Sequence, residues 1–401
     1  MSRINVLWVI DHVCYDGSLH GGGRLYWNVL RRFDPDRFRV VPCLLRASDT
    51  IRQVFRQSPV PVRILDKAKF DPTTLWTLLR LLKAEDIHVM HLHCYGASTF
   101  GRLAGWLAGV PSIIHDYDTE IYFPYPWYLG LADRLLAPVT RLAIAPSPMV
   151  RDFLITRRRV QRGRIETMLH AIPAERFARV PPEEVCRTKE HLGILQQARI
   201  VGTVTKLGPQ RGNEYLLKAA VEVVRAVPNA LFLVVYKPTY FHRLPNQRYV
   251  QVSSKDTAGM VAGLRDLASK LGIAGHVRFV EAHENVDTLV AACDLMVAPF
   301  LSERFSSVNL LEAMAMRKPV IATDLGEQRE FIEDRVNGYL VPAGDVEALA
   351  RTIVKVLTQE EEGRRMGERA RVTAEGFSAD AYVQRLQSLY GELAMNGKTS
   401  G

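Results

Sequence analysis

Short apolar runs alternate with longer segments of helical periodicity along the chain, and this alternation predicts the fold. The first run, residues 4–10 (INVLWVI), reads as a buried strand. Further strands of the first half are expected at residues 38–45, 87–92 and 111–115. Helices are expected between them, at residues 25–33, 73–85 and 98–107. Strands and helices that alternate in this way favour a parallel sheet with helices on both faces.

The same alternation returns in the second half of the chain. Strands are expected at residues 199–205, 231–236, 276–280, 295–299 and 319–323. Residues 237–260 are irregular and indicate a long inserted loop, and the proline-rich stretch from Pro173 to Pro182 is the expected domain boundary. The prediction is an α/β protein of two doubly wound domains that face a cleft, followed by a last helix. The predicted ranges are 1–180, 181–377 and 378–395.

Composition agrees with two globular domains. Of the 401 residues, 47% are apolar and 24% are charged, which is enough for two cores. The formal net charge of +9 suits phosphate-bearing ligands, anionic lipid or nucleic acid, although such a charge also serves solubility. The five cysteines form no CxxC pair, and no apolar run approaches the ~18 residues of a membrane span. We therefore expect a cytoplasmic protein with reduced cysteines.

Three glycines, Gly21 to Gly23, stand between the first strand and the helix after it. Without a β-carbon, Gly22 and Gly23 let the backbone approach a ligand at the start of that helix. A tight turn without a ligand is the alternative. The dinucleotide fingerprint is not met, because Tyr26 stands where its third glycine would be, and the chain has no GxxxxGK[ST] phosphate loop.

Histidines occur at the ends of two predicted strands. His91 and His93 lie two apart on one strand and share a face, as a metal-binding pair would. No third ligand stands at a supporting spacing, so a structural histidine pair is the favoured interpretation. His115 precedes Asp116 directly after a buried strand, which suits substrate hydroxyls or catalysis. A capping or core histidine is the alternative.

Aromatic residues interleave with prolines from Ile121 to Tyr128, and arginines cluster between Arg157 and Arg164. Aromatic and basic side chains together can contact lipid headgroups or a sugar acceptor. A lid packed on its own domain and a solvated charged surface explain the same residues.

Two cations flank a Gly/Pro turn at a predicted helix start, in the segment from Lys206 to Arg211. Two positive charges and free N–H groups near one place suit a diphosphate. Ordinary surface charges are the alternative.

The stretch from Pro299 to Pro342 carries most of the information about function. Glu312 is the one carboxylate within an almost wholly apolar helix, 308–316, so it should face a ligand or a partner. The turn before that helix, Phe305 to Ser307, is a candidate anion cradle because helix starts carry unpaired N–H groups. A phosphate cradle with a nearby carboxylate for hydroxyls suits a nucleotide sugar.

These motifs together resemble glycosyltransferase family 4, retaining enzymes of the GT-B arrangement. The resemblance rests on three motifs: Glu303 to Glu312 with the strand PVIAT and the segment NGYLVP, the segment from Gly202 to Gly212, and the glycine loop with His115 and Asp116. It covers nearly the whole chain. Eight residues separate Glu303 from Glu312, where the family normally has seven.

The resemblance implies a role for each residue. Glu312 would bind the ribose hydroxyls, Lys206 and Arg211 the donor diphosphate, and Glu303 the donor sugar. Gly22, Gly23, Ser306 and Ser307 would add backbone contacts to the donor, and His115 would hold the donor sugar beside the acceptor. The last helix would cross back to the first domain. No metal and no cofactor are expected.

The predicted function is transfer of a hexose-type sugar from a nucleotide-diphosphate sugar to a hydroxyl acceptor, either a glycan, a polysaccharide or a lipid-linked intermediate. We expect the protein to be cytoplasmic, with peripheral contact at the inner membrane face and without a nucleic acid partner. Two alternatives stay open: a nucleotide-sugar 2-epimerase of the same fold, and a non-catalytic homologue that binds nucleotide sugars. The sequence leaves the base, the sugar and the acceptor open.

Overall fold

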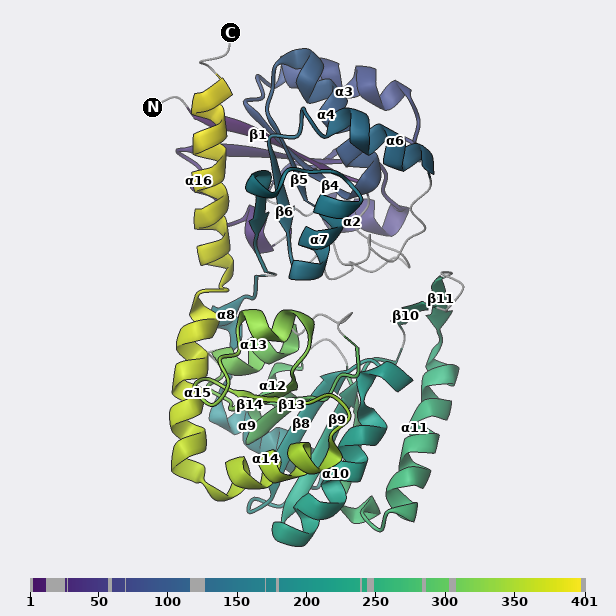
Figure 1. Cartoon of the computed structure of the whole chain (residues 1–401), viewed down its shortest axis with the longest axis vertical. Helices are drawn as coiled ribbons and strands as arrows, with labels where there is room; N and C mark the ends of the chain where they lie inside the picture. Colours follow the sequence, from purple (N-terminus) through teal and green to yellow (C-terminus); the bar gives the residue numbers. More distant parts are fainter. Residues whose placement is uncertain are drawn as a thin grey trace. The chain divides into compact units, whose positions relative to one another are not determined.

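The computed structural model places most of the chain. It describes residues 3–11, 26, 28–56, 60–68, 70–115, 127–169, 171–177, 180–238, 240–243, 249–282, 286–302 and 308–397. These residues form two compact units, one of residues 1–171 with 379–401 and one of residues 172–378. Each unit is an α/β fold with a parallel sheet, as the alternation of strands and helices predicts (Figure 1).

The first unit has a seven-stranded parallel sheet of order β3-β2-β1-β4-β5-β6-β7. Its strands are β1 (Ile4–Ile10), β2 (Phe38–Leu44), β3 (Arg63–Ile64), β4 (Val89–His93), β5 (Ser112–His115), β6 (Leu142–Ala145) and β7 (Ile165–Thr167). Its helices are α2 (Asp49–Arg56), α3 (Thr73–Ala84), α4 (Cys94–Ala108), α6 (Trp127–Leu136), α7 (Pro148–Thr156) and α16 (Ala379–Gly397), with a 3₁₀ turn η1 (Arg162–Arg164). The strand order reverses between β1 and β4, and α/β sheets bind ligands at the carboxyl ends beside such a reversal.

The pleat of β1 divides its side chains between two cores. Val6, Trp8 and Ile10 point into one core, and Leu7 and Val9 point into the other. The first core is completed by the C-terminal helix α16, drawn in yellow, which lies against this sheet (Figure 1). The second core is covered by α3 and α4.

The second unit repeats the topology with a six-stranded sheet of order β12-β9-β8-β13-β14-β15. Its parallel strands are β8 (Arg199–Thr205), β9 (Ala230–Tyr236), β12 (Val277–Glu281), β13 (Leu295–Ala298), β14 (Val320–Thr323) and β15 (Tyr339–Val341). Its helices are α8 (Ala174–Phe177), α9 (Pro182–His191), α10 (Asn213–Ala226), α11 (Ser254–Lys270), α12 (Asp287–Ala291), α13 (Val308–Ala315), α14 (Val346–Thr358) and α15 (Glu360–Glu375), with the 3₁₀ turns η2 (Pro209–Arg211), η3 (Ala274–His276) and η4 (Gly326–Glu330). Here the order reverses between β8 and β13.

Two details differ from the sequence prediction. Residues 172–180, which the sequence assigns to the first domain, belong to the second unit, because Ile172 donates its N–H to the carbonyl of Phe377 at 2.9 Å. The predicted loop 237–260 contains an antiparallel hairpin of β10 (Tyr240–Arg243) and β11 (Tyr249–Val252). The helix after it begins at residue 254, because Ser253 and Asp256 form a reciprocal capping box there.

A buried ion-pair network fixes α6 in the first unit. Asp133 of α6 pairs with Arg102 of α4, and it also accepts two hydrogen bonds of 3.1 Å from Arg158. All three side chains are buried. The run from Arg157 to Arg159 is therefore only partly a solvated surface, since its central arginine is an internal partner of α6.

No helix within the described ranges is both long enough and apolar enough to cross a membrane.

Candidate functional site

The loop after β8 lies at the point where the second sheet reverses its strand order. Gly212 closes this loop with a positive φ of 71°, and a β-carbon there would lie 1.7 Å from the carbonyl oxygen of Pro299. The N–H of Leu301 donates to the carbonyl of Gln210 at 2.9 Å. The loop is therefore pressed against the residues that follow β13, and only glycine permits this approach.

Three cations gather at this loop. Lys206 is half-buried, and burial, followed by the charges of Arg211 and Lys237, lowers its pKa from 10.5 to about 8. The guanidinium of Arg211 lies over the ring of Phe300, 5.3 Å from its centroid. The sequence indicated Lys206 and Arg211 but not Lys237. Lys237 could have been recognised from its position directly after β9, because β9 is the neighbour of β8 in the sheet.

Glu312 lies on α13, close to the same edge of the sheet. The amide nitrogen of Asn309 donates to the carbonyl of Val204 at 2.7 Å, which fixes the first turn of α13 beside the end of β8. Glu312 stands three residues later and therefore on the same side of the helix. It is half-buried, whereas the residues on either side of it, Leu311 and Ala313, are buried. The fold thus brings Lys206, Arg211 and Glu312 to one end of one sheet.

Asn213, the first residue of α10, is a polar residue of this loop that the sequence analysis missed. Its side chain is buried, and neither its oxygen nor its nitrogen hydrogen-bonds any residue of the described ranges. The available signal was its place directly after Arg211 and Gly212. A buried amide without partners costs free energy, so it is a candidate contact for a ligand.

Several predicted site residues lie outside the described residues. They are Gly21, Gly22, Gly23, Asp116, Glu303, Phe305, Ser306 and Ser307, together with residues 121–126 of the aromatic run. Their roles stay predictions.

In the first unit, three histidines gather at the carboxyl ends of β4 and β5. The parallel register pairs His93 with His115, and one ring nitrogen each of His91, His93 and His115 lie within 4.8 Å of one another. The sequence spacing gave no third histidine for the pair, whereas the register of neighbouring strands supplies it. All three rings are buried.

Burial disfavours the charged form of His91 and His93, and the cluster contains hydrogen bonds. Burial lowers the pKa of His91 to about 3, and burial followed by the charges of His91 and His115 holds the pKa of His93 well below its usual range. The two ring nitrogens of His91 face Tyr390 Oη at 2.6 Å and His115 Nδ1 at 3.3 Å. Three neutral imidazoles can bind zinc, but here both nitrogens of His91 are engaged in hydrogen bonds.

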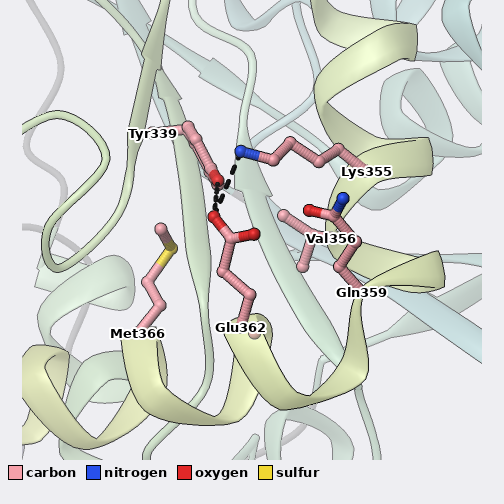
Figure 2. A pocket seen from close by; sticks show the side chains of 7 residues that line it. Tyr339, Lys355, Val356, Gln359, Glu362 and Met366 are labelled. Carbon is pink, nitrogen blue, oxygen red and sulfur yellow. Dashed lines mark hydrogen bonds and ion pairs between the residues drawn. The ribbon is translucent and has the colours of Figure 1, made fainter.

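A small hollow between α14 and α15 is not the site. Figure 2 shows that Tyr339, Lys355 and Glu362 close it with their own hydrogen bonds: the Tyr339 hydroxyl donates to Glu362 at 2.9 Å, and Lys355 pairs with Glu362 at 3.1 Å. Tyr339 is the first residue of β15, so the hollow lies at the opposite end of the strands from Lys206.

The architecture defines the class of the protein. Two Rossmann-like units, whose parallel sheets both reverse their strand order beside the first strand and one of which carries cations and a carboxylate at its carboxyl edge, have the GT-B fold. A solved structure of Anabaena Alr3699/HepE in complex with UDP superposes with a TM-score of 0.75 at 18% identity, over 97% of this chain and 100% of that one.

Family models then identify the family. The model described as "Glycosyl transferases group 1" matches residues 187–373, and the model described as "Glycosyltransferase Family 4" matches residues 19–176. The chain belongs to the group 1 glycosyltransferases of the family 4 type, which confirms the resemblance seen in its motifs.

Two curated relatives are glycosyltransferases. A D-inositol 3-phosphate glycosyltransferase of Mycobacteroides abscessus is 26% identical over 82% of this chain and 73% of its own. The UDP-Gal:alpha-D-GlcNAc-diphosphoundecaprenol alpha-1,3-galactosyltransferase of Escherichia coli is 22% identical over 87% of this chain and 86% of its own. The chain is thus a glycosyltransferase.

Proposed function

We propose that this enzyme transfers a hexose-type sugar from a nucleoside diphosphate to a hydroxyl acceptor, with retention of the anomeric configuration and without a metal or cofactor. The observation that carries the proposal is the cation cluster at Lys206, at the same end of the sheet as Glu312. The close backbone approach at Gly212 and the hydrogen bond from the Asn309 side chain to the Val204 carbonyl fix this arrangement. A departing nucleoside diphosphate develops negative charge, and fixed cations stabilise it without reorganisation.

The cations already affect one another in the ligand-free protein. Burial, followed by repulsion from Arg211 and Lys237, lowers the pKa of Lys206. A diphosphate bound beside these cations would offset this repulsion with its own negative charge. Glu312, one turn beyond Asn309, would accept hydrogen bonds from the ribose hydroxyls, while Glu303 and His115 would contact the sugar.

The test is nucleotide binding and product analysis. A thermal-shift panel of UDP-, GDP- and ADP-sugars identifies the donor, because a ligand of the native state raises Tm. With that donor, Glu312→Gln should lower nucleotide affinity by roughly 10- to 100-fold, since a hydrogen bond to a charged group contributes about 1.5–3 kcal/mol. Glu214→Gln on the exposed surface of α10 is the matched control. Unchanged affinity in Glu312→Gln would remove the assignment of the ribose site.

Retention and metal independence have separate readouts. The anomeric proton of the first product, followed by NMR, should show the configuration of the donor. The rate should persist in excess chelator, and a rate that returns only with a divalent cation would contradict the role given to Lys206 and Arg211. Conversion of UDP-GlcNAc without an acceptor would favour the 2-epimerase, and donor binding without any turnover would favour the binding protein.

A lipid-linked acceptor at a membrane surface is part of the proposal. The Escherichia coli relative is named for a diphosphoundecaprenol substrate. In this chain, α6 carries Trp127, Leu131 and Leu135 at four-residue intervals, with exposed fractions of 80%, 51% and 70%. The opposite side of α6 is anchored by Asp133, so this stripe faces outward. An exposed apolar stripe of this kind suits a lipid interface.

The residues from the stripe to Arg164 are rich in arginine, which favours lipids of negative charge. Residues 127–164 contain eight arginines and two aspartates, and Arg134, Arg141, Arg157, Arg159 and Arg162 are exposed. Arg164 donates to the carbonyls of Pro138 and Thr140 at 2.9 and 3.0 Å, which places the end of the basic run beside the loop after α6. Anionic headgroups would therefore meet the apolar stripe and the arginines together.

Vesicle sedimentation tests this surface. The protein should bind vesicles that contain phosphatidylglycerol, and high salt should release it. The double variant Leu131→Ser, Leu135→Ser should lower the partition more than tenfold, since each exposed leucine that enters the lipid contributes roughly 1.5–3 kcal/mol. Leu195→Ser, an equally exposed leucine of the second unit, is the control. Equal loss in both would show that the stripe is not the contact.

A further inference from the structure

A chain of hydrogen bonds runs through the buried interior of the first unit and ends at His115. Trp8 Nε1 lies 2.7 Å from Tyr390 Oη, which lies 2.6 Å from His91 Nδ1. His91 Nε2 lies 3.3 Å from His115 Nδ1. The four residues come from β1, α16, β4 and β5, and their side chains are all buried.

Chemistry fixes the direction of these hydrogen bonds. An indole N–H can only donate, so the oxygen of Tyr390 accepts from Trp8. Within the described part of the chain, the Tyr390 hydroxyl has one other hydrogen-bond partner, His91 Nδ1, and its proton therefore goes there. Burial raises the pKa of Tyr390 well above its usual value, so the hydroxyl keeps its proton.

The tautomer of each histidine follows. Burial keeps His91 neutral at physiological pH, so it carries one N–H. Because its Nδ1 accepts from Tyr390, that N–H is at Nε2 and faces His115 Nδ1. The two ring planes are parallel to within 9°, with centroids 5.3 Å apart, and the hydrogen bond joins their facing nitrogens at 3.3 Å. His115 Nδ1 accepts, and the proton of neutral His115 stands on Nε2.

We infer that Tyr390 is a positioning residue, which acts through His91 to hold His115 as the Nε2–H tautomer. In this tautomer Nε2 of His115 is a hydrogen-bond donor, and it has no lone pair that could take a proton. The inference rests on the proposed contact of His115 with the sugar. It assigns a task in the chemistry to the C-terminal helix α16.

The first test needs no activity. The full chain is labelled with ¹⁵N-histidine, and two-bond ¹H–¹⁵N correlations report which ring nitrogen carries the proton. His91→Gln and His115→Gln assign the two signals by their loss. The wild-type protein should show Nε2–H for both residues. A proton on Nδ1 of either one overturns the inference, as does a change of the His91 signal on addition of one equivalent of zinc, which would make the cluster a metal site.

The second test separates positioning from packing. Tyr390→Phe keeps the aromatic ring in the core and removes the hydroxyl. It should mix the tautomers of His91 and lower kcat by about tenfold, the scale of lost supporting hydrogen bonds, with KM for the donor nearly unchanged. Tyr382→Phe is the control, because Tyr382 is buried on the same helix and its hydroxyl hydrogen-bonds no residue in the described ranges.

The outcomes are distinct from those of the proposed function. An unchanged tautomer or an unchanged kcat in Tyr390→Phe overturns the positioning role, as does an equal loss in Tyr382→Phe. If Tyr390→Phe does not fold, the wild-type spectrum still decides the tautomer, and Trp8→Phe, which removes the donor to Tyr390, repeats the kinetic test. If no donor or acceptor supports transfer, the proposed function fails, while the spectra of wild type and Tyr390→Phe still decide the relay.

Discussion

Replacing Lys206 with methionine should stabilise the ligand-free protein and weaken its binding of nucleotide. Lys206 is charged in a half-buried position where Arg211 and Lys237 repel it. The methionine side chain has a similar length and carries no charge. The free energy of unfolding should therefore rise in the absence of ligand, while the affinity of the site for nucleotide falls.

The magnitude follows from the lowered pKa. The pKa of Lys206 falls from 10.5 to about 8, and each pKa unit corresponds to about 1.36 kcal/mol between the two protonation states. Holding the proton at pH 7 thus costs at most about 3 kcal/mol. Because water still reaches part of the side chain, we expect roughly 1–3 kcal/mol, or a Tm increase of roughly 2–10 °C for a unit of this size.

The pH dependence gives the effect a signature. Below pH 8 folded and unfolded chains both hold the Lys206 proton, and the cost is fully present. Between pH 8 and 10.5 the unfolded chain holds this proton while the folded chain loses it, so wild-type stability gains on the variant by up to about 1.36 kcal/mol per pH unit. The advantage of Lys206→Met should disappear near pH 10.5.

Scanning calorimetry at pH 7 and pH 9.5 measures this difference. Lys218→Met replaces an exposed lysine on α10 and should change Tm little at either pH. Titration with UDP should show roughly 10- to 100-fold weaker binding in Lys206→Met, since it loses a hydrogen bond between charged groups. A destabilised Lys206→Met at pH 7, or an advantage that does not shrink with pH, would refute the reasoning.

Three further predictions follow from the same structure. The affinity of the wild type for UDP should be steady below pH 8 and weaken above it by up to about tenfold per pH unit, because the diphosphate binds the protonated Lys206. Calorimetry in two buffers of different ionisation enthalpy at pH 8.5 should detect proton uptake on binding. An affinity that does not change with pH would contradict this prediction. Gly212→Ala should lower both Tm and nucleotide affinity, because its β-carbon would clash with Pro299. Gly208→Ala is the control, since a β-carbon there has open space. Equal effects of the two variants would argue against the close approach at Gly212. Asp133→Asn should destabilise the first unit by about 3–5 kcal/mol in denaturation, since it removes the charge of the carboxylate that pairs with two buried arginines. A loss below about 1 kcal/mol would show that the network is dispensable.

The hydrophobic pattern predicts the sheets well because buried parallel strands are continuous apolar runs. Residues 4–10, 199–205 and 231–236 were expected as strands, and β1, β8 and β9 lie there. The hairpin of β10 and β11 was not predicted because its strands are only four residues long and, in the described part of the chain, pair with each other and not with the main sheet. The start of α11 depended on a capping box, which the chain marks with Ser253 and Asp256.

Candidate site residues could be proposed from the sequence where neighbouring residues along the chain suggest the chemistry. Lys206 and Arg211 flank a visible turn, and Glu312 interrupts an apolar helix. The remaining features depend on neighbours that are distant in sequence: His115 joins His91 only through the register of β4 and β5, and the lowered pKa of Lys206 requires the burial that the fold provides.

The position of α16 has a consequence for how the chain is made. Trp8 and Tyr390 are 382 residues apart in sequence, yet they share a hydrogen bond in one core. During synthesis from the N-terminus, one apolar face of the first sheet stays uncovered until the whole second unit has been synthesised, because α16 follows that unit in the chain. The second unit can complete its own core first, since its residues 172–378 are continuous. The part of the chain synthesised first is thus the part that can finish folding last, and it would need protection from aggregation until α16 arrives.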